Sequence, residues 1–278
     1  SVCCITYNHA SYIRQCLDGF MMQKTDFDFE VLIHDDASTD NTASIIREYE
    51  EKYPDIIKPI YQKENQYSKG KGILAPFVYP QAKGKYIALC EGDDYWTDPY
   101  KLQKQVDIME KNSKYSLCVH NAYRLYSNNK MELINAKGEI PKLETKNIIR
   151  HGVGTLPTNS MFFKKADIID LPKWFYMCPV GDYPLVVYLS TKGDIYYADT
   201  AMSVYRYMTP GSWTSNMRKV SHYTEYILKS IKMYKYLYIE LGVDYLYSIS
   251  NRVFTLIYNY IVFLIKHPVK KFLKCIKF

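Results

Sequence analysis

Short apolar runs alternate with segments of helical periodicity along the first part of the chain, and this alternation strongly limits the fold. The runs are continuous rather than alternating, as in strands that are buried on both faces of a parallel sheet. They cover residues 1–6, 29–34, 56–61 and 85–90. Apolar residues recur at helical spacing in residues 12–21, 41–52 and 99–111. Strands that alternate with helices in this way predict βαβ units and an α/β fold with a mostly parallel central sheet.

The second part of the chain is less regular. Strands are expected in residues 115–124, 159–163, 195–198 and 203–207, and a helix near residues 182–189. From about Lys219 onward the pattern is helical. No repeat or low-complexity linker interrupts the 278 residues. We therefore expect residues 1–100 and 101–215 to be two halves of one domain, followed by a helical, basic extension at 216–278.

The positive charge of the chain is concentrated at the C-terminus. The formal net charge is +7, yet residues 245–278 contain no acid and six Lys or Arg residues. Next to an apolar segment, such a basic end favours an anionic membrane surface over nucleic acid.

The apolar segment itself, residues 253–265, is thirteen residues long, which is short for a bilayer span. Two interpretations stay open: an interfacial helix that meets lipid, or a helix docked on the core with a solvated basic end.

The seven cysteines show neither CxxC spacing nor a Cys/His ligand pattern. Several lie in the strand-like runs, where cysteine usually behaves as a small buried hydrophobe. This usage predicts reduced thiols and a cytoplasmic location.

Polar clusters directly follow three of the expected parallel strands. They are Thr6-Tyr7-Asn8, Asp35-Asp36-Ala37-Ser38 and Glu91-Gly92-Asp93-Asp94. Ligands of open α/β sheets bind beyond the carboxyl ends of the strands, so these clusters are expected to converge on one rim.

Each acidic cluster has a functional and a structural interpretation. Asp93 and Asp94 suit a hard divalent cation, but Gly-Asp-Asp is also turn chemistry. Asp36 is suited to bind a nucleoside or to cap the chain. Asp182, at an expected helix start, is suited to act as a helix cap or as a general base. A P-loop, an HExxH zinc motif and a GxSxG elbow are absent from the sequence.

Taken in order, these clusters resemble glycosyltransferase family 2, whose members have the Rossmann-like GT-A fold. The resemblance covers about residues 1–210. It rests on VCCITYN at 2–8, DDASTD at 35–40, AKGKYI at 82–87 and EGDDYW at 91–96. It implies an inverting, metal-dependent transfer of a sugar from a nucleoside-diphosphate sugar, with a UDP-sugar expected. The donor would bind to residues 1–100 and the acceptor to residues 101–215.

The resemblance also implies roles for individual residues. Asp36 would contact the nucleobase, and Asp93 of the DXD-type motif would lie by the ribose. Asp94 would ligate Mg²⁺ or Mn²⁺ at the diphosphate. Asp182 would be the catalytic base, and Arg206 would neutralise the leaving group. The other expected donor-binding residues follow strand one and are Thr6, Tyr7 and Asn8.

The sequence departs from the family pattern at two places. Residues 68–73 stand where relatives carry Ala-Arg-Asn. Lys69 or Lys71 could replace that phosphate contact, but the favoured interpretation of both is a surface lysine. In the late loop, Met208-Thr209-Pro210 replaces a usual histidine, so a third metal contact is not expected there.

On the acceptor side, Thr158 and Asn159 fall where such enzymes line the acceptor pocket. Trp96 is the tryptophan best placed to stack on a sugar ring; Trp213 is a second candidate, and Trp174 is expected to be a core residue.

The sequence thus predicts a peripheral glycosyltransferase at the inner face of the cell membrane, acting on a glycan or lipid-linked acceptor in surface polysaccharide synthesis. The alternatives are a sugar nucleotidyltransferase and a non-catalytic carbohydrate- or membrane-binding protein on the same fold.

Overall fold

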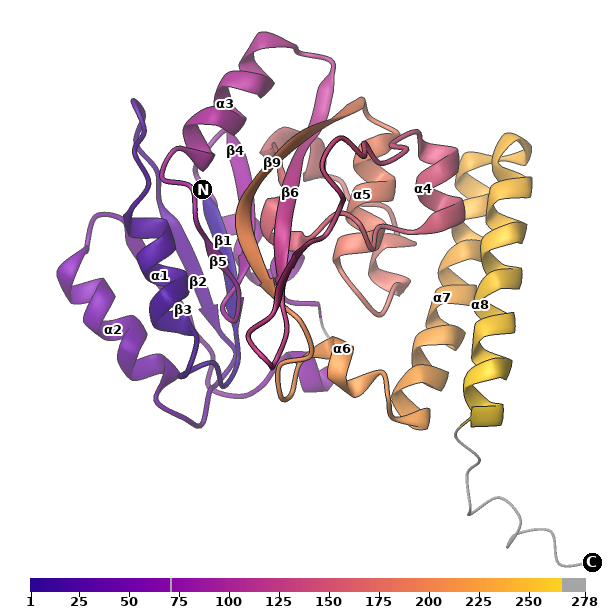
Figure 1. Cartoon of the computed structure of the whole chain (residues 1–278), viewed down its shortest axis with the longest axis horizontal. Coiled ribbons are helices and arrows are strands. Elements are labelled where there is room, and N and C mark those ends of the chain that lie inside the picture. Colours follow the sequence, from indigo (N-terminus) through magenta and orange to yellow (C-terminus); the bar gives the residue numbers. More distant parts are fainter. Residues whose placement is uncertain (71, 267–278) are drawn as a thin grey trace, which may run out of the picture.

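A curved sheet runs through the centre of the molecule (Figure 1). The structure is a computed structural model, and it describes residues 1–70 and 72–266. The strands are β1 Val2–Thr6, β2 Val31–Asp35, β3 Ile57–Tyr61, β4 Tyr86–Glu91, β5 Tyr95–Trp96, β6 Tyr115–Leu125, β7 Met131–Leu133, β8 Phe162–Lys164 and β9 Asp194–Arg206. Their order is β3-β2-β1-β4-β8-β6-β9-β5, with β7 paired to β6.

The predicted α/β architecture is confirmed, and the parallel strands are concentrated in its first half. β3, β2, β1 and β4 are all parallel, with Val2 opposite Val31 and Ala88. From β8 onward the sheet is mixed, because β8 runs antiparallel to both β4 and β6 while β6 and β9 are parallel. The buried residues of β1, β2 and β4 explain their continuous apolar runs.

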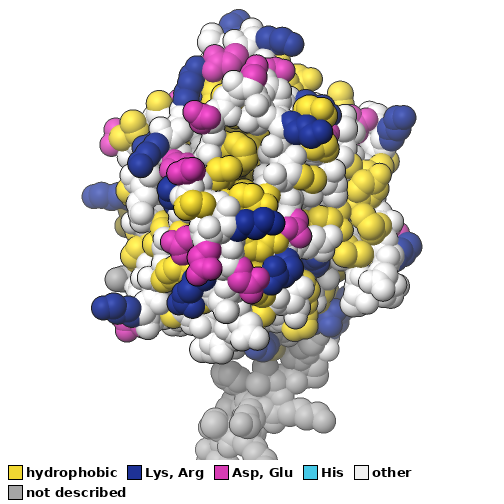
Figure 2. All heavy atoms as spheres, turned by 90° about the vertical axis from the view of Figure 1, so that its left-hand side faces the viewer, with side chains coloured by type: hydrophobic (Ala, Val, Ile, Leu, Met, Phe, Trp, Pro, Cys, Tyr) yellow, Lys and Arg dark blue, Asp and Glu magenta, His cyan; other side chains and the backbone are white. Residues whose placement is uncertain are grey.

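Helices cover the sheet on both sides. They are α1 Ile13–Met21, α2 Thr42–Lys52, α3 Lys101–Lys111, α4 Thr145–His151, α5 Asp182–Ser190, α6 Trp213–Asn216, α7 Val220–Leu241 and α8 Leu246–Lys266. In Figure 1, α1 and α2 flank β1–β3, whereas α7 and α8 form an antiparallel pair at the opposite end, next to α4. The α1 side shows Lys, Arg, Asp and Glu side chains intermixed rather than a patch of one sign (Figure 2).

Element boundaries differ from the sequence expectation at three places. α3 begins at Lys101, because Asp98 accepts the backbone N–H of Tyr100 (2.8 Å) and keeps Pro99 in the preceding turn. The two strands expected at 195–198 and 203–207 are one strand, β9, which stays continuous through register irregularities opposite β6. Asn159 lies in a short 3₁₀ turn, Thr158–Ser160, that precedes β8.

The apolar C-terminal segment forms a longer helix than the thirteen-residue run suggested. Within the described residues, Val243–Lys266 is long and apolar enough to cross a membrane by length and composition, with 24 residues and a mean hydropathy of 1.3. One face of α8 packs on the protein through Ile249 and Leu256. The expected tail at 267–278 lies outside the described residues.

The opposite face of α8 is apolar and exposed. Its members recur at helical spacing, and each is at least half exposed: Tyr247, Phe254, Tyr258, Ile261 and Ile265. We call these five residues the outer stripe. No charged side chain belongs to the stripe, and Lys266 follows its last member.

Candidate active site

The carboxyl ends of β1, β2 and β4 lie next to one another, as the sequence predicts. Parallel pairing places Thr6 opposite Asp35 and Ile5 opposite Glu91. The Asp36 N–H continues the ladder by donating to the Thr6 carbonyl oxygen (3.0 Å). The three polar clusters therefore form one rim, because parallel strands end at the same edge of the sheet.

Asn8 joins the loop after β1 to the loop after β2. Its backbone N–H donates to Ser38 Oγ (2.9 Å), and its side-chain oxygen accepts from the Thr39 N–H (2.7 Å). Both loops contain a residue in the left-handed region, Asn8 at φ 55° and Ala37 at φ 62°. Alanine is costly there, so the surrounding hydrogen bonds hold the conformation. Tyr7, beside them, is 43% exposed and presents a ring to solvent.

Asp36 is buried and holds a distant loop. Its two carboxylate oxygens accept the backbone N–H groups of Gln66 (2.8 Å) and Tyr67 (3.0 Å). Thr6 is also buried, and its Oγ1 has no partner within the described residues. The predicted contacts of Thr6 and Asp36 with a nucleoside stay predictions, and Asp36 has a clear structural function beside them.

Carboxyl groups gather beyond β4 and at the start of α5. Removal from water, together with the charges of Asp93 and Asp182, raises the pKa of Glu91 to about 8. Burial likewise raises the pKa of Asp182, and burial with the charges of Asp93 and Glu91 raises that of Asp94. Glu91 thus lies within electrostatic reach of Asp93 and Asp182, and Asp94 lies within reach of Asp93 and Glu91. Within the described residues, none of them forms an ion pair with Lys, Arg or His.

Asp94 is fully enclosed by hydrogen bonds from the protein. Its Oδ2 accepts from Asn159 Nδ2 (3.0 Å), and its Oδ1 accepts from the Arg206 N–H (2.8 Å). Asn159 also donates to the Val204 carbonyl oxygen (3.1 Å) and accepts from Ser203 Oγ (2.8 Å). With both oxygens engaged and the side chain 1% exposed, Asp94 anchors β9 to the rim. This geometry favours an anchoring role over the predicted role of metal ligand.

Asp93, which is also buried, and Arg206 lie next to that anchor. Thr209 Oγ1 donates to Asp93 Oδ2 (2.9 Å), which leaves Oδ1 without a bond from the described residues. The Arg206 guanidinium donates to the Asp93 carbonyl oxygen rather than to a carboxylate. It lies between the rings of Tyr12 and Tyr95, at 5.1 and 4.6 Å from their centroids. A cation is thus fixed beside the carboxyl cluster.

Asp182 begins α5, as predicted. Its Oδ1 accepts the N–H of Tyr183 (2.7 Å), so the helix N-terminus orients the carboxyl group. The remaining residues of α5 are almost entirely buried, which fixes this helix start firmly against the sheet. Gly181 is the N-cap and Asp182 is the first helical residue, so the roles of Asp182 as a cap and as a base both stay predictions.

The oxygen ligands of the rim fit a hard divalent cation. The described residues contain no set of three His, Cys, Asp or Glu side chains that already forms a metal site. Mg²⁺ and Mn²⁺ at phosphate-transfer sites need only one or two carboxylates, because substrate phosphate and water fill the other positions. Glu91 and Asp93 provide that number, and a bound cation would favour the charged form of Glu91, whose pKa is raised by burial and by the neighbouring carboxyl groups.

Two of the residues predicted for the acceptor side are buried. Trp96 is 2% exposed, packs edge-on against Phe20 (4.7 Å) and donates through Nε1 to the Asn159 carbonyl oxygen (3.0 Å), so its ring is not available for stacking on a sugar. Asn159 is likewise buried, and its side-chain amide donates a hydrogen bond to Asp94. Thr158, half-buried in the same turn, keeps its predicted role as an open expectation.

The other two tryptophans differ in exposure. Trp174 lies in the core, as expected. Trp213, 40% exposed at the start of α6, is the tryptophan with an accessible ring.

Glu91 is the rim residue that the sequence analysis did not single out. The available signal was its position two residues before Asp93, which makes Glu91-Gly92-Asp93 a carboxylate-X-carboxylate set. Lys69 forms an ion pair with Glu64 at the protein surface. Lys71 lies outside the described residues, so the replacement phosphate contact stays untested.

Known proteins similar to this chain agree with this fold. The family described as glycosyl transferase family 2 matches residues 1–170. An uncharacterised protein of Mycobacterium tuberculosis is 36% identical over 225 residues, which cover 77% of this chain and 60% of that relative. The chain thus spans less than two thirds of the length of that curated relative.

Two solved structures share the architecture. S. aureus TarS, residues 1–349, in complex with UDP-GlcNAc matches with a TM-score of 0.55 and 19% identity, covering 83% of this chain and 65% of that one. The mannosyltransferase PcManGT from Pyrobaculum calidifontis, in complex with GDP-Man and Mn²⁺, matches with a TM-score of 0.56 and 16% identity, covering 90% and 72%. At these identities the likeness concerns the GT-A fold.

Proposed function

Because this chain belongs to glycosyl transferase family 2, we propose that it transfers a sugar from a nucleoside-diphosphate sugar to an acceptor hydroxyl group. The observation that carries the proposal is the meeting of Glu91, Asp93 and Asp182 at the carboxyl edge of the parallel strands. Three carboxyl groups from two distant segments, without ion pairs of their own in the described residues, form a site that is completed by a cation and a substrate.

The donor binds across the rim, with its nucleoside near Tyr7, Asn8 and Asp36 and its diphosphate near Asp93. A uridine nucleotide is the first expectation. Two structures of the same fold are complexes with UDP-GlcNAc (TarS) and with GDP-Man (the mannosyltransferase), so UDP and GDP are both probes of the donor site.

Glu91 and Asp93 would hold a Mg²⁺ or Mn²⁺ ion, and Asp94 positions Asp93 by anchoring the chain to Asn159 and Arg206. The ion supplies Lewis-acid neutralisation of the diphosphate. Arg206, fixed beside Asp93 between two aromatic rings, adds a second positive charge for the leaving group.

Asp182 takes the proton of the acceptor hydroxyl. As the acceptor oxygen forms its bond to the anomeric carbon, the bond from that carbon to the diphosphate oxygen breaks, and the nucleoside diphosphate leaves with the bonding electrons. Attack opposite to the leaving group inverts the anomeric centre. The raised pKa of Asp182 suits this role, because a stronger base accepts the proton more readily near neutral pH.

The acceptor is a glycan or lipid-linked sugar of surface polysaccharide synthesis, and the protein works at the cytoplasmic face of the membrane. The outer stripe of α8 supports this location, since an apolar helix face that ends at Lys266 is typical of interfacial helices. The lysines that follow in the sequence, at 270, 271, 274 and 277, favour anionic lipid.

Calorimetric titration of the purified protein with UDP, GDP and CDP, with and without Mn²⁺, tests the donor site. We expect Mn²⁺-dependent binding of one nucleotide, lost in Asp93→Asn. Asp94→Asn serves as the matched neighbour. We expect it to lower the melting temperature, and to weaken metal-dependent nucleotide binding less than Asp93→Asn does. Stronger weakening of binding by Asp94→Asn than by Asp93→Asn would assign the metal to Asp94.

Asp182→Asn separates binding from chemistry. We expect nucleotide binding within about twofold of the parent and a loss of transfer of at least about a hundredfold, the usual contribution of a general base. Unchanged turnover would remove Asp182 from the mechanism. A folded protein that binds none of the three nucleotides would favour the non-catalytic alternative.

A further inference from the structure

Lys101, the first residue of α3, lies in the interior of the protein. Its side chain is fully buried, and it forms no ion pair within the described residues. Burial lowers the pKa of its amine from the ordinary value of 10.5 to about 7, although Cys90, Cys118 and Asp98 oppose this shift. The buried His120 also lies within electrostatic reach. A buried amine without an acidic partner is unfavourable for folding, so the contacts of Lys101 must indicate its role.

The amine of Lys101 contacts two side chains. Nζ donates to Gln105 Oε1 (2.7 Å), one turn further along α3. Nζ also lies over the ring of Trp96, 3.9 Å from the ring centroid. The amine thereby orients the amide of Gln105, because an oxygen that faces a donor leaves the Nε2 group to face an acceptor elsewhere. The Trp96 ring is held by this amine and by Phe20 (4.7 Å).

Gln105 and Trp96 both donate hydrogen bonds to the 3₁₀ turn that precedes β8. Gln105 Nε2 donates to the Ser160 carbonyl oxygen (2.9 Å). Trp96 Nε1 donates to the carbonyl oxygen of Asn159 (3.0 Å). Two successive carbonyl groups of the turn are therefore held by the two side chains that Lys101 orients. These bonds are buried, so a lost donor would leave a carbonyl group without a partner.

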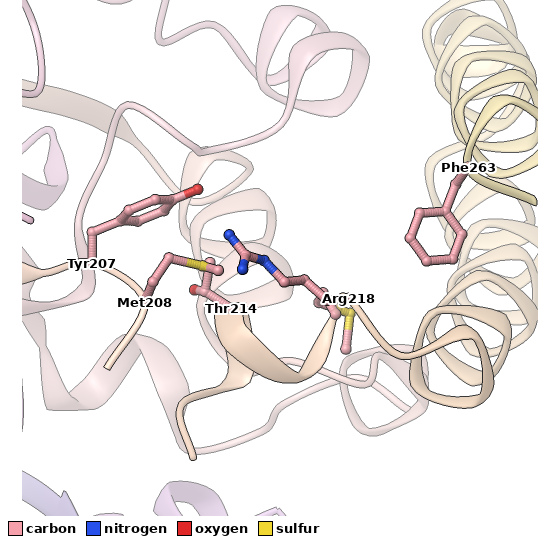
Figure 3. Close-up of a pocket in the computed structure, with 6 residues that line it drawn as sticks. Tyr207, Met208, Thr214, Arg218 and Phe263 are labelled. Carbon is pink, nitrogen blue, oxygen red and sulfur yellow. The ribbon is translucent and has the colours of Figure 1, made fainter. Parts of the chain in front are cut away.

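The same turn secures the carboxyl rim. Asn159 Nδ2 donates to Asp94 Oδ2 (3.0 Å), and Asp94 Oδ1 accepts from the Arg206 N–H (2.8 Å). Arg206 is the last residue of β9. The next residues, Tyr207 and Met208, line one side of a hollow of about 500 Å³ whose other side is formed by α8 (Figure 3). The position of the turn thus determines where Asp94 and the end of β9 lie.

We propose that Lys101 is a positioning residue for the sugar transfer, because its amine fixes the turn that carries Asn159. Gln105 and Trp96 pass its effect to the turn, and Asp94 passes it to the end of β9. The inference rests on the proposed function, since the rim that is positioned is the proposed site of the donor nucleotide. Lys101 itself touches no substrate.

Lys101→Met tests this role, since methionine keeps the length of the side chain and removes its N–H donors. The control is Lys111→Met, the same change at the exposed last residue of α3. The first measurement is the exchange of the indole N–H groups with solvent, followed by NMR. The chain has three tryptophans, so Trp96→Phe assigns the signal of Trp96. Trp174, in the core, reports on general loosening.

In Lys101→Met we expect the indole N–H of Trp96 to exchange at least about fivefold faster, as the loss of a buried hydrogen bond allows, and that of Trp174 to stay unchanged. The second measurement is calorimetric binding of UDP and GDP with Mn²⁺. The nucleotide that the parent binds is expected to bind Lys101→Met at least about fivefold more weakly. Lys111→Met is expected to match the parent in both measurements.

Gln105→Met interrupts the same path at its next step, and we expect it to weaken nucleotide binding as well. In the double variant with Lys101→Met, the loss is expected to be smaller than the product of the two single losses, because one residue acts through the other. A full product would overturn the proposed path. If Lys101→Met does not fold, unchanged nucleotide binding in Gln105→Met would overturn it.

Three results in Lys101→Met would contradict the positioning role. The first is exchange at Trp96 equal to that of the parent. The second is equally faster exchange at Trp96 and Trp174, which would show general loosening. The third is faster exchange at Trp96 with unchanged nucleotide binding, since the turn would then not control the donor site. A parent protein that binds no nucleotide would contradict the proposed function, whereas exchange at Trp96 would still decide whether Lys101 fixes the turn.

Discussion

Glu91 shows how a single side chain can link stability to ligand binding. The pKa of its carboxyl group is raised from the ordinary value of 4.5 to about 8, first by burial and then by Asp93 and Asp182. The folded protein therefore binds a proton there that the unfolded chain releases. Between about pH 4.5 and about pH 8 the unfolded chain loses this proton, whereas the folded protein either retains it or carries an unfavourable buried charge. The free energy of unfolding therefore falls as the pH rises across that window.

We therefore expect metal-free protein to lose thermal stability as the pH rises toward 8, and Glu91→Gln to flatten that dependence. Added Mn²⁺ should restore more stability at high pH than at low pH, since it neutralises the charged form. Melting curves at several pH values, with chelator or Mn²⁺, measure both effects. The same pH slope in Glu91→Gln and the parent would show that this carboxyl group does not control it.

The turn between β4 and β5 depends on a close approach that only glycine allows. A Cβ on Gly92 would meet Thr6 Oγ1 at 2.7 Å and Thr6 Cβ at 2.8 Å, both parts of the neighbouring strand end. Any larger residue must push β1 and β4 apart at the rim, which separates Glu91 and Asp93 from the loop after β1.

Gly92→Ala is accordingly expected to lower the free energy of unfolding by about 1–3 kcal/mol, as overpacking does, and to weaken metal-dependent nucleotide binding. Gly154→Ala is the matched control, because a Cβ there meets nothing within 4 Å. Denaturant unfolding and nucleotide titration measure the two effects. Equal behaviour of both variants would contradict the close-approach argument.

Helix α8 has two apolar faces with different tasks. Leu256 is 5% exposed and packs on the protein, whereas Phe254, two residues away in sequence, is 71% exposed. Leu256→Ala is expected to cost about 2–5 kcal/mol of stability, like other buried leucines. Phe254→Ser is expected to change stability by less than about 0.5 kcal/mol and to weaken binding to anionic vesicles several-fold.

Chemical denaturation and vesicle flotation of the two variants check this contrast. Unchanged flotation for Phe254→Ser, and again for a double variant with Ile261→Ser, would contradict the membrane role of the outer stripe. Point variants are preferable to removal of residues 251–278, since that deletion would also remove Leu256 and the Arg252 guanidinium, which lies 6.0 Å from the centroid of the Tyr183 ring.

At the scale of the whole molecule, the two expected halves share one sheet. β8 pairs with β4, and β5 pairs with β9, so strands from the two sides of residue 100 meet at two places in the sheet. The rim is shared in the same way, because Asn159 and Arg206 secure Asp94 from the second half. The site exists only when both halves are folded together.

A fragment of residues 1–100 is therefore expected not to fold, although it contains most of the predicted donor residues. Without β8 and β9, the apolar edge of β4 and the buried ring of Trp96 would be exposed to water. Circular dichroism and amide hydrogen exchange of the fragment check this. A cooperative, protected fragment would show that the first half is an independent unit.

Local pattern was sufficient for some conclusions. Apolar runs on both faces of β1, β2 and β4 and the polar residues directly after them predicted the parallel strands and their common rim, because parallel strands end at one edge. The start of α5 at Asp182 followed from the same kind of local signal. Composition likewise identified the apolar, basic C-terminal segment.

Only the tertiary structure decided which of these side chains are available to a ligand. Trp96, Asn159 and Asp94 have the residue types of a binding site, yet hydrogen bonds and ring contacts from chain-distant partners enclose them, and no local pattern records such partners. Glu91 stands out only in the folded protein, where packing brings the carboxyl groups of Asp93 and Asp182 near it and raises its pKa. Sequence determined which strands form and where they end; the three-dimensional packing of distant segments determined which polar groups at those ends stay open, because burial depends on contacts between residues far apart in the chain.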